Sequence, residues 1–158
     1  MQRPHVAGKF LQLEGHRFGF RVRGVTYGTF RPDSDGMQFP AADRVAEDFA
    51  AMAGSGFNTV RTYTAPPRWL LDEAMRNGLR VIVGLPWEQH ITFLDDPGRP
   101  ARLEASVAAG VRACAGNPAV LWYALGNEIP APIVRWHARR ALEPFVRRLF
   151  DTAMRSER

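Results

Sequence analysis

Side chains that can transfer protons stand directly after an apolar segment of this sequence. Asn127 and Glu128 follow the apolar run LWYAL at 121–125. A carboxylic acid at the end of an apolar strand is partly removed from water, which raises its pKa towards neutrality. Such a group can both give and accept a proton, so we expect Glu128 to act as a general acid/base.

Other side chains could hold a ligand beside this carboxyl group. Aromatic rings offer an apolar face on which a sugar ring can stack. Arginine and asparagine supply donors of fixed direction for hydroxyl groups and carboxylates. The candidate binding residues all stand on or just after apolar runs, and they are Tyr27, Arg61, Tyr63, Trp87, Glu88 and Asn127.

The elements that must position these residues alternate between strand and helix. Short apolar and β-branched runs predict strands at 25–27, 57–64, 79–87 and 119–125. Apolar residues at helical spacing predict helices over about 45–53, 70–75, 103–114 and 132–154. This order predicts an α/β fold with a parallel sheet, whose strands end at one common edge. A β-hairpin turning at Glu14-Gly15 is predicted before it, over residues 10–22.

Three segments resemble one group of enzymes. Gly126-Asn127-Glu128 is similar to the Asn-Glu signature at the fourth strand of retaining glycoside hydrolases with a TIM (β/α)8 barrel, including the β-galactosidase/β-glucuronidase family. FNTVRTYTAPP at 57–67 and GLRVIVGLPW at 78–87 are similar to the second and third strands of that family. The resemblance covers about residues 10–155. It implies one partial domain, 1–158, in which residues 23–155 are four βα units, (βα)4, or half of the barrel.

The resemblance also implies roles for three residues and a class of substrate. Glu128 would be the acid/base, Asn127 would bind the 2-hydroxyl of the sugar, and Arg61 would orient the nucleophilic carboxylate. The reaction would be hydrolysis or transfer at O-glycosidic bonds of β-linked glucans or related oligosaccharides, with neither cofactor nor metal. A retaining mechanism needs two carboxyl groups roughly 5 to 5.5 Å apart. The nucleophile of that family lies on the seventh strand, which has no counterpart here.

Several alternatives remain open at this point. Glu88 could supply a second carboxyl group at the roughly 6.5 to 9.5 Å that an inverting mechanism uses. Asn127 and Glu128 could merely cap a helix, and Arg61 could be a structural ion-pair partner. The segments VTYGTF, VRTYT, GLPWEQH and GNEIP also resemble the barrel region attached to some large bacterial membrane glycosyltransferases. The chain could therefore be a catalytically incomplete module that binds sugar or packs against a partner domain.

The amino-acid composition limits which classes of partner we expect for this chain. The net charge of +5 comes almost wholly from arginine, since Lys9 is the only lysine. The arginines near the C-terminus fall on one polar helix face and no aromatic residues interleave with them, so we expect no nucleic-acid partner. No apolar run has membrane-spanning length and no secretion signal is visible, which predicts a cytoplasmic chain or the soluble part of a larger membrane protein. Cys114 lies on an apolar helix stripe and is expected in the core.

A half-barrel is also expected to associate with a second half. Four parallel strands cannot close a barrel, because about eight are needed for side chains to fill its interior. The open strand edges and the uncovered inner layer would favour association. We expect the missing half to come from the same longer chain or from self-association.

Overall fold

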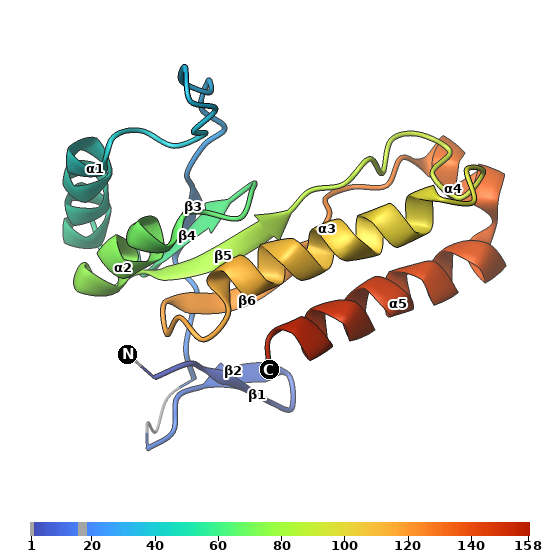
Figure 1. The fold of residues 1–158 in the computed structure, drawn as a ribbon. Coiled ribbons are helices and arrows are strands. Elements are labelled where there is room, and N and C mark those ends of the chain that lie inside the picture. The colour runs from blue at the N-terminus through green and yellow to red at the C-terminus, as the bar shows by residue number, and fades with distance from the viewer. Residues whose placement is uncertain (1, 16–18) are drawn as a thin grey trace.

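The computed structural model describes residues 2–15 and 19–158 (Figure 1). Strands and helices alternate after a short N-terminal hairpin. In chain order the elements are β1 (His5–Ala7), β2 (Phe10–Gln12), β3 (Gly24–Thr26), α1 (Ala42–Gly54), β4 (Thr59–Thr62), α2 (Arg68–Arg76), β5 (Arg80–Leu85), α3 (Arg99–Cys114), β6 (Val120–Leu125), α4 (Ala131–His137) and α5 (Arg139–Ser156).

A parallel four-stranded sheet, in the order β3-β4-β5-β6, forms the centre of the fold. All three strand pairs are parallel, and neighbours in the chain are neighbours in the sheet. This arrangement confirms the predicted α/β class and the four predicted strands. It also brings the carboxyl ends of all four strands to one edge.

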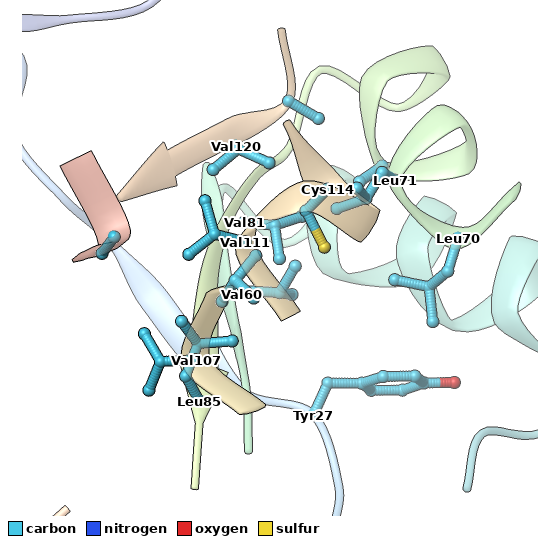
Figure 2. Packing of buried hydrophobic residues seen from close by; sticks show 14 of the residues in the cluster. Tyr27, Val60, Leu70, Leu71, Val81, Leu85, Val107, Val111, Cys114 and Val120 are labelled. Carbon is cyan, nitrogen blue, oxygen red and sulfur yellow. The ribbon is translucent and has the colours of Figure 1, made fainter. Parts of the chain in front are cut away.

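The two faces of this sheet differ because successive strand side chains point to opposite sides. Val60, Val81 and Val83 are fully buried and pack with helix residues in one apolar cluster. Figure 2 shows Val60 and Val81 gathered with Val107, Val111 and Cys114 of α3 and with Leu70 and Leu71 of α2. The alternate positions, such as Arg61 and Ile82, face the other side and are only half-buried.

Cys114 lies in this core, as predicted. The residue is fully buried, and burial raises the pKa of its thiol to about 11. A thiol with so high a pKa carries almost no thiolate near neutral pH, which makes it a packing residue and not a nucleophile.

Strand β6 carries an irregularity that changes the direction of its side chains. Val120 pairs with Val81, but the next residue of β5, Ile82, pairs with Trp122, so that Leu121 is an extra residue. An extra residue shifts the alternation by one position. Trp122 therefore lies on the open face and is 38% exposed, although its apolar surroundings in the sequence predict a core position.

The N-terminal hairpin is present but lies earlier than predicted. β1 and β2 pair as antiparallel strands over residues 5–12, and Gly8, at φ +61°, supplies the turn. The predicted first strand is thus the second strand of the hairpin. The predicted return strand begins in residues 16–18, which lie outside the described residues. Phe20 still donates a backbone hydrogen bond to Leu11, 2.7 Å long, without forming a strand.

The N-terminal segment covers one end of the open face. Arg80, at the start of β5, is only 5% exposed because its guanidinium contacts the carbonyl of Gln2 and lies 5.0 Å from the ring centre of Phe20. Burial, followed by the charge of Arg3, lowers the pKa of Arg80. Covering this end leaves the opposite end, where the strands terminate, as the accessible part of the face.

The predicted fourth helix is wrong in one respect, because two helices, α4 and α5, occupy its place. The break is at Ala138, whose φ of 58° is incompatible with a right-handed helix. α4 buries His137 beside Phe93, with 4.7 Å between ring centres, whereas α5 buries Leu142 and Phe145. No glycine or proline marks residue 138, so the break depends on tertiary packing.

Among the described residues, no helix is long and apolar enough to cross a membrane.

A close approach between β4 and β5 depends on Gly84. A Cβ atom at this position would press against the backbone carbonyl oxygens of Thr62 and Tyr63. We expect Gly84→Ala to lower the free energy of unfolding by about 1–3 kcal/mol, because the two strands must separate. Urea denaturation measures this change. Gly54→Ala is the matched control, since nothing lies within 4 Å of its added Cβ. Equal effects of the two changes would contradict the prediction.

Apolar side chains beside the β6 edge are exposed to solvent. Phe150 is 54% exposed and Met154 is 49% exposed on α5, next to Trp122. We expect the isolated chain to form dimers or aggregates, or to need a longer parent polypeptide, because this surface and the strand edges attract partners. Light scattering over a range of concentrations should show a rising mass, reduced by Phe150→Arg and not by Met75→Arg on α2. A monodisperse monomer at high concentration would exclude this expectation.

Candidate active site

A hydrogen bond joins the ends of two strands that are not neighbours. The Nη2 atom of Arg61, on β4, donates to the Oδ1 atom of Asn127, after β6, over 3.0 Å. β5 lies between these strands. Its residue on this face nearest the strand end is Gly84, which has no side chain to separate the partners. Two of the predicted site residues, one from each strand, are therefore in direct contact.

The guanidinium of Arg61 has a second neighbour and a free donor. Its Cζ atom lies 5.2 Å from the ring centre of Tyr63, within the range of a cation–π contact. Its Nε atom is buried and has no hydrogen-bond partner among the described residues. A buried charged donor without an acceptor is costly. The site is thus suited to one further acceptor, such as a carboxylate.

Glu128 follows Asn127 directly but is exposed. The partial desolvation expected from its place behind an apolar strand is not supplied by the described residues. The reason is that the apolar strand ends at Leu125 and three residues then lead out of the sheet. Glu128 has the chemistry of an acid/base, while the environment that would tune it must come from elsewhere.

Glu88 is directed towards α3. Its Oε2 atom lies 3.7 Å from the Nε atom of Arg99, and its side chain is 60% exposed. Asp96 lies at 3.6 Å from the same nitrogen. Such exposed pairs contribute little to stability. The carboxylate of Glu88 is therefore already placed beside a cation at the start of a helix.

Tyr27, a predicted substrate-binding residue, lines a cavity at the ends of β3 and β4, while its hydroxyl is turned towards α1. It shares the helix-facing side of β3 with Val25 and is only 4% exposed. Its hydroxyl donates to Asp48 of α1 over 2.8 Å, and its ring contacts Phe49 edge-on. Burial, and then this hydrogen bond, raises the pKa of Tyr27 far above its ordinary value.

Trp87 is likewise placed in the core and not beside an open sugar site. It is 8% exposed, and the rings of Phe93 and Phe145 pack edge-on against it at 4.8 and 5.7 Å. The indole instead supports the turn before Asn127, because a Cβ atom at Gly126 would lie 2.5 Å from its Nε1 atom. Gly126, at φ +84°, is thus a positioning residue that the sequence analysis missed.

A cavity of about 200 Å³ lies next to Tyr63, at the ends of β3 and β4. The loop between β3 and α1 supplies most of its lining. Of this lining, sequence analysis named Tyr27 and Tyr63 and missed the loop residues after Tyr27, for which the only signal was a long loop after a strand, the usual place of binding residues in such folds. In the described part of the chain, no three His, Cys, Asp or Glu side chains group closely enough to hold a metal ion.

The fold and the site together define a parallel α/β unit with polar side chains at the carboxyl edge of its sheet. No family model matches the sequence. No curated protein matches it either. Solved structures do, and those named here are bacterial β-glucuronidases.

The β-glucuronidase of Faecalibacterium prausnitzii superposes with a TM-score of 0.74 at 16% identity, over 99% of this chain and 26% of that one. The Ruminococcus gnavus β-glucuronidase in complex with D-glucuronic acid gives a TM-score of 0.71 at 16% identity, over 99% and 25%. That of Bacteroides uniformis gives 0.59 at 19%, over 87% and 17%. The chain therefore has the fold of a segment of these enzymes and spans about a quarter of their length or less.

The hydrogen bond of Tyr27 provides a test of its structural role. We expect Tyr27→Phe to lower the free energy of unfolding by about 0.5–1.5 kcal/mol, because Asp48 loses its donor. Binding of oligosaccharides should not change, since the hydroxyl points away from the strand ends. Thermal denaturation and a binding titration on the same preparation measure both quantities. Weaker sugar binding without lower stability would restore Tyr27 as a binding residue.

Proposed function

We propose that this chain is the leading half of a TIM-barrel glycoside hydrolase or transglycosidase that acts on O-glycosidic bonds of β-linked glucans or related oligosaccharides. The observation that carries this proposal is the hydrogen bond between Arg61 and Asn127, which links β4 and β6 directly beside Glu128. The β-glucuronidase-like fold supports it. So do the sugar ligands of the Ruminococcus gnavus neighbours.

In this proposal Glu128 is the general acid/base. Its protonated carboxyl group gives a proton to the leaving oxygen, and the resulting carboxylate then accepts a proton from the attacking water or sugar hydroxyl. Asn127 binds the 2-hydroxyl of the sugar at the cleaved bond. These two roles need only residues that stand at the accessible end of the sheet.

Arg61 holds the second carboxyl group in this proposal. Its unpartnered Nε donor suits the carboxylate of a nucleophile supplied by the other half of the barrel. That half would also cover Glu128 and remove it from water, as its acid/base role needs. The linkage and the choice between hydrolysis and transfer would then be decided largely by residues outside this segment.

A second candidate is a carbohydrate-binding or structural module without catalysis, as part of a larger glycosyltransferase. The observation that favours it is the exposure of Glu128 together with the position of Glu88 beside Arg99. Neither carboxyl group is paired with the other among the described contacts. Binding without turnover is the behaviour expected of this module.

The test compares Glu128→Gln with the unchanged sequence, each in a protein that also supplies the second half of the barrel, on an aryl β-glucoside and on β-linked glucose oligosaccharides. We expect kcat to fall by about 10²–10⁴-fold, the usual contribution of a general acid/base, with little change in KM for the oligosaccharide. Glutamine keeps the shape and loses only the proton transfer. Steady-state release of the aryl alcohol and of reducing ends measures the change.

Glu88→Gln is the matched control, because it alters the other carboxyl group beside the strand ends. If the rate is unchanged in Glu88→Gln, Glu88 is not the partner of Glu128 in an inverting pair. If Glu128→Gln is as active as the unchanged chain, the acid/base proposal is wrong. Oligosaccharide binding with no turnover in any form would favour the binding module.

A further inference from the structure

The cavity beside Tyr63 has a lining with a distinct chemistry. Aromatic rings and uncharged polar groups form it, and none of the described residues that line it is charged. Tyr27, Phe30 and Tyr63 offer apolar surface, while Thr29, Gln38 and Thr64 carry hydroxyl or amide groups. None of these three polar side chains takes part in a hydrogen bond with another described residue. They remain available to a ligand.

Each class of group in this lining matches a part of a sugar. The C–H face of a pyranose is apolar and packs on aromatic rings, whereas its hydroxyl groups both donate and accept hydrogen bonds. Threonine hydroxyls and the glutamine amide can do the same. A carboxylate finds no cationic partner among the lining residues, and burying one without such a partner is strongly unfavourable.

The cavity is connected to the proposed acid/base through a short series of contacts. Tyr63 lines the cavity, and its ring also makes a cation–π contact with the guanidinium of Arg61. Arg61 is hydrogen-bonded to Asn127, the residue before Glu128. A sugar in the cavity would therefore be separated from the hydrogen-bonded pair of Arg61 and Asn127 only by the side chain of Tyr63.

We infer that this cavity is a subsite for one uncharged pyranose ring of the substrate, and that its lining makes the chain prefer neutral sugars to uronic acids. This inference rests on the proposed function and deepens it. The volume of about 200 Å³ fits a single ring, since pockets for larger ligands occupy roughly 300–1,000 Å³. Gln38 is the specificity-determining residue, because it is the longest polar side chain of the lining and stands at an exposed position.

The test uses two probes that differ only at C6, methyl β-D-glucopyranoside and methyl β-D-glucopyranosiduronate, each titrated into the 158-residue chain and followed by NMR. We expect the glucoside to bind more tightly. Gln38→Ala and Tyr63→Ala should each weaken its binding by about 2- to 12-fold, the usual effect of one lost hydrogen bond or aromatic contact. Gln38→Arg should shift the preference towards the glucuronide by about 10-fold, because it adds a cation.

Asp35→Asn is the matched control, since Asp35 is exposed on the same loop but outside the cavity lining, and it should leave both affinities unchanged. Circular dichroism of each variant confirms that it is folded. Glucoside binding that is lost in Asn127→Ala but unchanged in both Gln38 variants would overturn the subsite and leave the proposed function intact. Tighter binding of the glucuronide by the unchanged chain would overturn the neutral preference. Absence of binding by either probe would overturn the subsite and the sugar-binding proposal together.

Discussion

The rest of this structure depends on the parallel pairing of four consecutive strands. Parallel neighbours need a crossover between them, and each crossover here contains a helix that must bury an apolar stripe. The apolar stripes of the helices pack against Val60, Val81 and Val83 on one face of the sheet. The opposite face keeps the polar and partly exposed residues, among them Arg61 and Tyr63. Because the helices bury their apolar stripes on one face of the sheet, the core lies on that face and the candidate site lies on the other.

The same alternation decides how much of each aromatic side chain is exposed. Tyr27 and Trp87 continue the helix-facing series of β3 and β5 and are buried by α1 and α5. Tyr63 belongs to the other series and remains 38% exposed. In β6 the extra residue Leu121 reverses the series and turns Trp122 outward. Proximity to a strand end is thus not sufficient for a site residue, because the direction of the side chain must also be correct.

The electrostatics of the site are incomplete in a specific way. Arg61 contacts Asn127 and Tyr63, yet its buried Nε donor has no acceptor among the described residues, and Glu128 is exposed. The guanidinium of Arg61 lacks an acceptor, and the carboxyl group of Glu128 lacks protection from water. Both would be relieved by a surface that brings a carboxylate to Arg61 and removes water from Glu128. This is why the proposed function requires a second half of the barrel, from a longer chain or a second copy.

The sequence by itself determined the α/β class, the four central strands, the core position of Cys114, and the placement of Arg61 and Asn127 at one edge of the sheet. Those features follow from local periodicity and from the rule that parallel strands end at one edge. Only the tertiary structure decided the remainder. The hairpin lies at residues 5–12, the last helix breaks at Ala138, and Tyr27 and Trp87 turn into the core. These depend on which residues pack together across the chain, and a local pattern of residue types carries no information about that packing.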